Sequence, residues 1–178
     1  MQRDTRQRPP GLNQDELTAW KAFLRAHAVI TRALERQLLA SRDLPLAEYD
    51  VLVQLSEAPG RALRMAQLAD QVLLSRSGLT RLVERMEQSG LVQRQSCPND
   101  ARGSLAVLTE RGQELLRSAA PGHLDAVRTH FVDPLGKDQL ALLSPALERL
   151  AASCPQSSAP ACVGDQPERN RNSERIGQ

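Results

Sequence analysis

Aromatic residues are scarce in this chain of 178 residues: two phenylalanines, one tryptophan and one tyrosine make up 2% of it. The interior must therefore be built mostly from aliphatic side chains, and few rings are available to shape a substrate pocket. Leucine and alanine recur at steps of three and four residues, which predicts a mainly α-helical protein.

Several other sequence signals are missing as well. No apolar run reaches the length of a membrane span, and the polar start from Met1 to Arg6 lacks the apolar core of a secretion signal, so we expect a cytoplasmic protein with no membrane partner. Cys97, Cys154 and Cys162 are odd in number and unpaired in spacing, which argues against disulfides and a zinc ribbon. Without a phosphate loop or nucleophile elbow, the sequence predicts neither an enzyme nor a cofactor.

The formal net charge of +2 is small, but the charge is unevenly distributed. Between residues 61 and 102, seven arginines stand against four acidic residues, so this segment has a larger positive charge than the whole chain. Local clustering of this kind, more than the total charge, is typical of a surface that binds nucleic acid.

Residues 64–92 have the pattern of a helix-turn-helix. A short amphipathic segment from Arg64 to Val72 is followed by Ser75, a helix-capping residue type, and then by a second helix that ends near Gly90. One face of this second helix is apolar, whereas the other has the hydroxyl and guanidinium groups that suit the DNA major groove. The residues predicted to contact DNA from it are Ser75, Arg76, Ser77, Thr80 and Arg81.

The segments 91–96 and 104–108 are predicted to form a β-hairpin, the wing, with Leu105 and Val107 pointing to the interior. The loop between them contains Asp100-Ala101-Arg102. We expect Arg102 to enter the minor groove and Asp100 to brace the loop. Contacts with phosphate groups are expected from Arg64 and Arg94.

Amphipathic helices are predicted on both sides of this unit. The first begins after Asn13, which has capping-box spacing with Glu16, and a partner subunit would explain the width of its apolar stripe. Beyond the wing, Thr109 is expected to cap a fifth helix, and leucines mark a last helix from Leu140 to Leu150. The chain thus divides into a basic arm (1–11), one folded domain (12–153) and a tail (154–178) whose composition predicts disorder.

Together these motifs resemble the MarR family of winged helix-turn-helix regulators. The matching stretches are Leu68-Ala69, residues 75–83, Gly90-Leu91-Val92, and Asp100-Ala101-Arg102 leading to Leu108-Thr109. The resemblance implies a homodimer, joined through its N-terminal and C-terminal helices, that binds a pseudo-palindromic operator in double-stranded DNA. It also implies a transcriptional regulator, commonly a repressor, that releases DNA when a small phenolic or carboxylate effector binds.

The resemblance places the effector near Trp20, His27, Tyr49 and Asp50. Core packing explains Trp20 and Tyr49 equally well, and Asp50 shares a polar face with Gln54 and Glu57. The three histidines are spaced too widely to predict a metal site. Two alternatives to a ligand-responsive repressor stay open: a winged helix that binds proteins, and a redox sensor in which Cys97 is oxidised.

We predict that Arg102→Ala weakens DNA binding and leaves the fold intact, because the side chain is expected to contact DNA and not the core. Circular dichroism and a binding titration on the same sample measure the two properties. Unchanged affinity would contradict the assignment of Arg102 to the minor groove.

Overall fold

The computed structural model describes residues 11–72, 74–97 and 100–153; the predicted basic arm up to residue 10 and the predicted tail lie outside this range. The side chains of residue 97 and residues 100–103 lie outside it as well. The helices are α1 (Gln14–Arg42), α2 (Leu46–Glu57), η1 (Pro59–Arg61), α3 (Met65–Gln71), α4 (Arg76–Gln88), α5 (Glu110–Val127), η2 (Arg128–Val132) and α6 (Asp133–Ser153). The strands are β1 (Ala62–Arg64), β2 (Val92–Cys97) and β3 (Asp100–Leu108).

Three helices, α1, α4 and α5, start where the sequence predicts, because each start is marked by a local capping residue. Asn13 Oδ1 accepts a hydrogen bond from the Glu16 amide at 2.9 Å, and Glu16 Oε2 accepts one from the Asn13 amide at 2.8 Å. Ser75 Oγ accepts from the Gly78 amide at 3.1 Å, and Thr109 Oγ1 accepts from the Gly112 amide at 3.0 Å. These three caps confirm the predicted starts of α1, α4 and α5.

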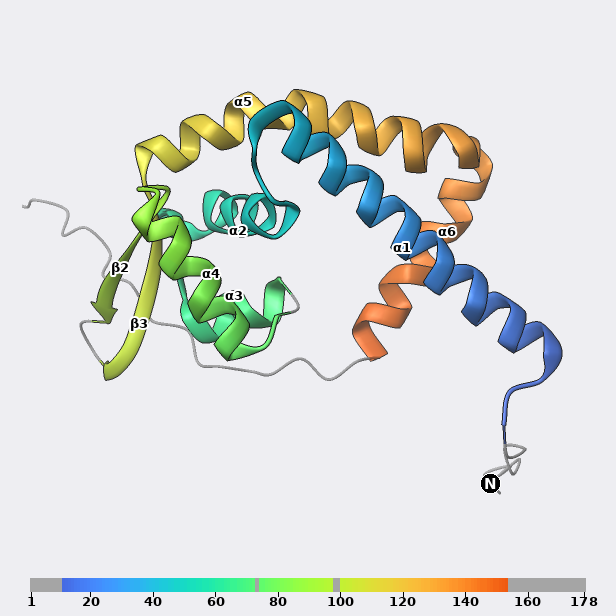
Figure 1. The fold of residues 1–178 in the computed structure, drawn as a ribbon. Helices are drawn as coiled ribbons and strands as arrows, with labels where there is room; N and C mark the ends of the chain where they lie inside the picture. Colours follow the sequence, from blue (N-terminus) through green and yellow to red (C-terminus); the bar gives the residue numbers. More distant parts are fainter. Residues whose placement is uncertain (1–10, 73, 98–99, 154–178) are drawn as a thin grey trace, which may run out of the picture.

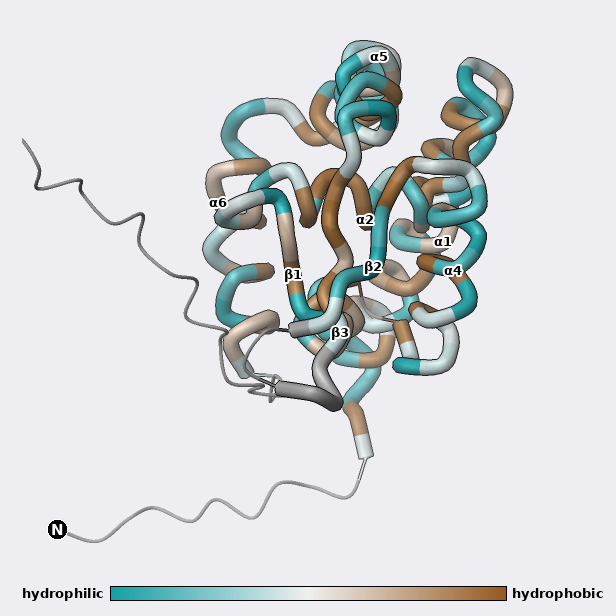
Figure 2. The backbone as a smooth tube through the Cα atoms, turned by 90° about the vertical axis from the view of Figure 1, so that its left-hand side faces the viewer, coloured by the Kyte–Doolittle hydropathy of each residue, from teal (hydrophilic) through white to brown (hydrophobic). Residues whose placement is uncertain are grey.

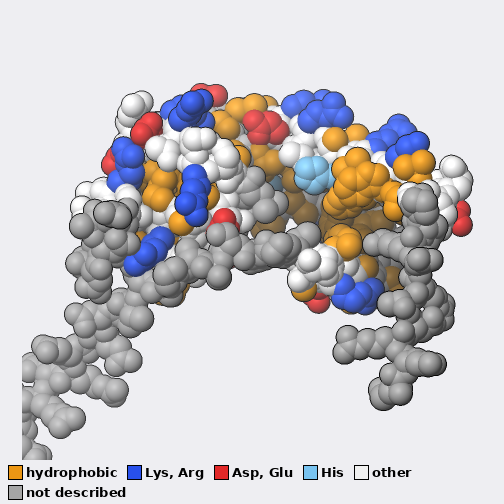
Figure 3. Space-filling view, turned by 90° about the horizontal axis from the view of Figure 1, so that it is seen from below, with side chains coloured by type: hydrophobic (Ala, Val, Ile, Leu, Met, Phe, Trp, Pro, Cys, Tyr) orange, Lys and Arg blue, Asp and Glu red, His pale blue; other side chains and the backbone are white. Residues whose placement is uncertain are grey.

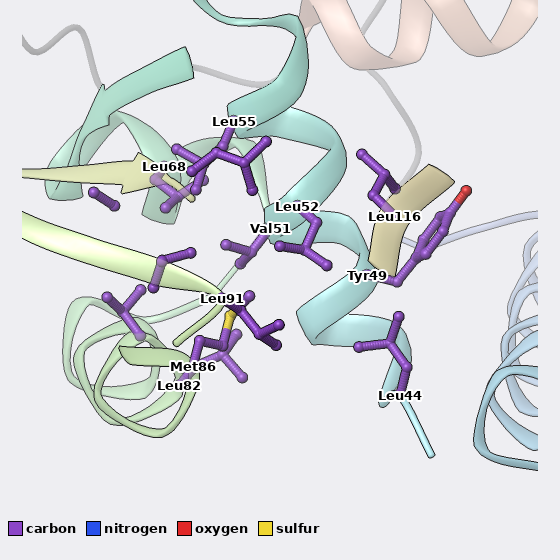
Figure 4. Close-up of a cluster of buried hydrophobic side chains, with 14 of the residues drawn as sticks. Leu44, Tyr49, Val51, Leu52, Leu55, Leu68, Leu82, Met86, Leu91 and Leu116 are labelled. Atoms are coloured by element: carbon purple, nitrogen blue, oxygen red, sulfur yellow. The ribbon is translucent and has the colours of Figure 1, made fainter. Parts of the chain in front are cut away.

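A single core of aliphatic side chains joins α2, α3, α4 and the sheet (Figure 4). It includes Leu52 and Leu55 of α2 and Leu68 of α3, all fully buried. Helix α4 contributes four buried side chains, Leu79, Leu82, Val83 and Met86, as its apolar stripe predicts. Since full burial of each large aliphatic side chain stabilises the fold by about 1.5–3 kcal/mol, α4 is held in one rotational orientation.

The three strands form an antiparallel sheet in the order β1-β3-β2. Strand β1 pairs through Leu63 opposite Ala106, and β2 pairs from Val92 opposite Leu108 to Ser96 opposite Ser104. The sequence predicts the β2–β3 hairpin but not β1. Three residues are too short to show an alternating pattern, so β1 is defined only by its pairing with β3.

The predicted orientation of β3 is wrong. Ala106 is 0% exposed and Leu108 is 6% exposed, whereas Leu105 and Val107 are only partly buried. The prediction placed the larger side chains inside. Instead, β3 packs against α2, and the small Ala106 side chain lies at the fully buried position.

The start of α5 is fastened to the turn between α4 and β2. Thr109 Oγ1 lies 2.7 Å from the Gly90 carbonyl oxygen and 2.9 Å from that of Leu91, and the Thr109 amide donates to the Leu91 oxygen at 3.2 Å. Gly112 packs so closely on this turn that a Cβ atom would overlap the Leu91 carbonyl and crowd Leu108. We call Gly90, Leu91, Thr109 and Gly112 the α5 joint.

Helices α1 and α6 extend away from this compact part of the molecule. In Figure 1, α5 passes over α2, and α6 turns back across the line of α1; in Figure 2, α1 and α6 lie on opposite sides. The first half of α1 and the whole of α6 bury no side chain in the single chain. Among the helices of the described residues, none is long and apolar enough to cross a membrane.

We predict that Gly112→Ala lowers the free energy of unfolding by about 1–3 kcal/mol, because the added methyl group collides with a backbone carbonyl that cannot move freely. Gly122→Ala in the same helix is the matched control. There the added Cβ meets only the flexible amide end of Gln37, so we expect a change of less than about 1 kcal/mol, in the stabilising direction. Urea unfolding of both variants measures the difference, and equal losses would contradict the steric argument.

Candidate nucleic-acid interface

The first two turns of α4 present a polar surface to solvent. Arg76, Ser77, Thr80 and Arg81 are all exposed, and Ser75 caps the helix beneath them. Thr80 Oγ1 donates to the Arg76 carbonyl at 2.9 Å, and the Ser75 and Ser77 hydroxyls lie 3.3 Å apart. The structure therefore places these five predicted residues on one end of a single helix, whose partial positive charge favours phosphate.

The arginines of α4 differ in their surroundings. Within the described part of the chain, neither Arg76 nor Arg81 has an ion-pair partner, so both guanidinium groups are available to a ligand. Arg85 instead points towards α2, where its Nε lies 3.9 Å from Glu48 Oε1. Burial raises the pKa of Glu48, and the nearby Arg85 charge opposes that rise.

Arg94 of β2 makes contacts that the sequence analysis does not anticipate. Its Nε donates to Glu87 Oε2 at 2.9 Å, its backbone amide donates to Glu87 Oε1 at 3.1 Å, and its Nη1 lies 3.5 Å from Glu84 Oε1. The hydrogen bond from the Arg94 amide, followed by the one from its side chain, lowers the pKa of Glu87. The predicted phosphate contact of Arg94 stays a prediction. The guanidinium group of Arg94 already has two carboxylate partners, which would compete with a phosphate group.

The remaining predicted DNA contacts lie on β1 and at the wing. Arg64 ends β1 and is partly buried, and its backbone amide donates to Gln67 Oε1 at 3.3 Å. Asp100 and Arg102 lie in β3, with Asp100 paired to Cys97, but the side chains of all three lie outside what the structure describes. The expected roles of Arg102, Asp100 and Cys97 stay predictions.

The predicted effector residues fall into two separate groups. Trp20 and His27 lie on the exposed half of α1 on either side of Phe23, with ring centroids 5.9 Å and 6.3 Å from it. Tyr49, by contrast, is buried on α2, and no ring contact in the described residues links it to Trp20 or His27. The structure thus does not bring the two groups together in one chain.

A polar junction between α1, α2 and α5 surrounds Tyr49. The Tyr49 ring lies 4.3 Å from that of His123, and burial lowers the pKa of His123, which favours the neutral imidazole. Asp50 is exposed, but desolvation of its carboxyl group by the surrounding protein, and then the charge of Glu35, raises the pKa of Asp50. His123 Nδ1 and Gln37 Oε1 are buried and have no hydrogen-bond partner among the described residues. We call Glu35, Gln37, Tyr49, Asp50 and His123 the polar junction.

Sequence reasoning did not select Glu35, Gln37 or His123 for this site. These residues come from α1 and α5, which are far apart in the sequence. The one sequence signal for their proximity is Gly122 next to His123, because a Cβ atom at Gly122 would approach the Gln37 amide nitrogen to 2.7 Å. Glu84 and Glu87 were also missed, although their positions at the end of α4, ten and seven residues before Arg94, could have suggested the ion pairs.

A family model and solved structures both relate this chain to the MarR family. The model of the MarR family matches residues 42–103, from the end of α1 to the wing. Sco3205, a MarR family transcriptional regulator from Streptomyces coelicolor whose crystal structure is a complex with DNA, is 39% identical with a TM-score of 0.76. That similarity covers 82% of this chain and 91% of Sco3205.

Two further relatives extend the comparison. AbsC, a MarR family transcriptional regulator from S. coelicolor, is 39% identical with a TM-score of 0.74, over 80% of this chain and 96% of AbsC. An uncharacterized HTH-type transcriptional regulator from Bacillus cereus is 29% identical over 110 residues, which cover 62% of this chain and 71% of the relative. Because these similarities coincide with a helix-turn-helix whose polar face is exposed and a wing beside it, the chain belongs to the MarR family of DNA-binding transcriptional regulators.

Proposed function

We propose that this protein is a homodimeric repressor that binds a pseudo-palindromic operator and releases it when a small phenolic effector binds. The observation that carries the proposal is the orientation of α4. Four buried side chains on one face hold Arg76, Ser77, Thr80 and Arg81 outward on the other, as a helix that reads the major groove requires. The DNA complex of the similar protein Sco3205 supports this assignment.

In the proposed complex, the first turns of α4 lie in the major groove and the wing lies over the minor groove. Arginine and hydroxyl side chains at the start of α4 are suited to base edges and phosphates. Arg102 enters the minor groove, Asp100 braces the wing, and residues 12–153 act as one folded unit. The proposed DNA contacts are Arg64, Ser75, Arg76, Ser77, Thr80, Arg81 and Arg102.

The proposed dimer uses the apolar surfaces of α1 and α6. Trp20 is 50% exposed and Leu142 is 75% exposed, and Phe23, Leu24 and Leu150 are exposed as well. Figure 3 shows a broad apolar area on the side of the molecule where α1 and α6 lie. An exposed apolar area of this extent favours burial against another protein surface, and a second copy offers a matching one.

The polar junction is the proposed effector site. Gln37 Oε1 can accept a hydrogen bond from a phenolic hydroxyl group, and the rings of His123 and Tyr49, inclined at 37° to each other, offer aromatic surface to the phenol ring. Glu35 and Asp50 bring negative charge, so a neutral phenol fits better than a carboxylate. A ligand between α1, α2 and α5 can shift the spacing of the two DNA-binding units, because α5 is attached to α4 through the α5 joint.

We predict that the protein selects an inverted repeat from a pool of random duplexes, with half-site centres about 34 Å apart along the DNA axis. Fluorescence anisotropy then compares the selected duplex with a scrambled one over a range of salt concentrations. Equal, weak binding to both would contradict the proposed function and favour a winged helix that binds proteins.

Leu24→Glu is the variant that tests the dimer in the same assay. A charged side chain in the apolar surface should give monomers in analytical ultracentrifugation and abolish preference for the selected duplex. Ala22→Glu is the control, because it introduces the same charge on the opposite side of α1. A Leu24→Glu protein that stays dimeric would contradict the use of this surface.

We predict that salicylamide, a neutral phenol, weakens binding to the selected duplex more than salicylate does. His123→Phe should reduce this response and leave DNA affinity without the compound unchanged, because His123 lies away from α4 in the proposed complex. The readout is anisotropy titrated with each compound. A stronger effect of salicylate, or an unchanged response in His123→Phe, would contradict the proposed effector site.

A further inference from the structure

Two acidic residues, Glu84 and Glu87, lie on the second half of the DNA-binding helix α4. Negative charge on such a helix repels phosphate, and near a helix C-terminus it is also unfavourable because of the helix dipole. Both carboxylates contact one guanidinium group, that of Arg94 on β2. Among the described residues, the two unfavourable charges thus share Arg94 as their compensating partner.

The geometry of this contact fixes a strand to a helix. Glu87 binds Arg94 with both carboxylate oxygens, one to the backbone amide at 3.1 Å and one to Nε at 2.9 Å. Glu84 lies 3.5 Å from Nη1, one helical turn earlier. Because one carboxylate binds both main chain and side chain, β2 is restrained in position and in rotation about its axis.

The sheet register agrees with this arrangement. Arg94 lies opposite Ala106 of β3, so the two side chains share one face of the sheet. Ala106 is fully buried, which means that this face is the inward one. The Arg94 side chain therefore extends from the inward face towards α4.

We propose that Arg94 is a positioning residue: it neutralises Glu84 and Glu87 and sets the angle between α4 and the wing, without contacting a phosphate group. This inference rests on the proposed DNA-binding function and adds a specificity-determining residue to it. The turn at Gly90 and Leu91 joins α4 to β2, and the α5 joint holds that turn. The contact of Arg94 with Glu87 is a second attachment between β2 and α4, farther along the strand. Together with the turn held by the α5 joint, it fixes the direction of β2 relative to α4.

The test compares Arg94→Gln, Arg94→Lys and Glu87→Gln with the wild-type protein in the anisotropy assay, using the selected and the scrambled duplex over a salt series. Glu57→Gln is the control for loss of one negative charge, because Glu57 is exposed at the end of α2. Thermal unfolding of each variant confirms that it is folded. The salt slope is the decisive readout, since removal of one phosphate contact lowers it by about 0.9, or about 1.8 for the two copies in a dimer.

A positioning role predicts that Glu87→Gln, which removes one ion pair from each protomer and so two from the dimer, reduces the preference for the selected duplex by about two- to thirtyfold. Arg94→Gln removes both ion pairs of each protomer and should reduce the preference at least as much. The salt slope should stay at the wild-type value. A double variant, Arg94→Gln with Glu87→Gln, should lose no more preference than Arg94→Gln alone, because Arg94→Gln already removes the contacts with both Glu84 and Glu87. Compared with Arg94→Gln, Arg94→Lys should recover little of the preference for the selected duplex, since a lysine lacks the forked guanidinium group that binds both carboxylates.

A phosphate contact predicts the opposite pattern and would overturn the proposal. Glu87→Gln would then strengthen binding by releasing Arg94, Arg94→Gln would lower the salt slope on both duplexes, and Arg94→Lys would retain most of the affinity. Unchanged preference in both single variants would overturn it too. If the wild-type protein prefers no duplex, the proposed function itself fails, and this is seen before any variant is measured.

Discussion

The close contact at the α5 joint is the constraint on which the rest of the structure depends. Gly112 and Thr109 pack against the backbone of Gly90 and Leu91, so the helix that follows the wing starts directly on the turn that ends α4. Because that contact is made by backbone carbonyls and a glycine, the angle between α5 and the turn that ends α4 can vary little. The direction of α5 therefore fixes where α6 lies relative to the DNA-binding face, and α1 packs against α5 in turn.

The two halves of α4 differ in charge. The first half is basic and open to solvent, and the second half is acidic and turned to partners in β2, with Arg85 directed at α2. A single helix thus combines a surface for an anionic ligand with contacts that hold the neighbouring elements. Within the described residues, Arg85 and Arg94 lie near carboxylates, whereas Arg76 and Arg81 at the helix start have no ion-pair partner, so a chain of small net charge still presents a basic surface.

Local signals account for what the sequence could predict. Asn13, Ser75 and Thr109 each bind an amide three residues away, so helix starts and the exposed face of α4 follow from short stretches of sequence. The features that were missed or wrong depend on residues far apart in the chain. The pairing of β1, the burial of Ala106 in place of Leu105, and the contact of the Tyr49 ring with that of His123 are set by tertiary packing, which the periodicity of the sequence does not encode.

The exposed apolar surfaces of α1 and α6 have a consequence for how the protein responds to its own concentration. In the proposed dimer, the apolar surfaces of these two arms are covered only while two chains are associated, so the stability of each chain depends on protein concentration. An operator that needs both DNA-binding units is then occupied in proportion to the square of the monomer concentration when dimers are scarce. Under the proposed function, dilution during cell growth would reduce operator occupancy more steeply than it reduces the number of chains, so the protein would respond to its own abundance.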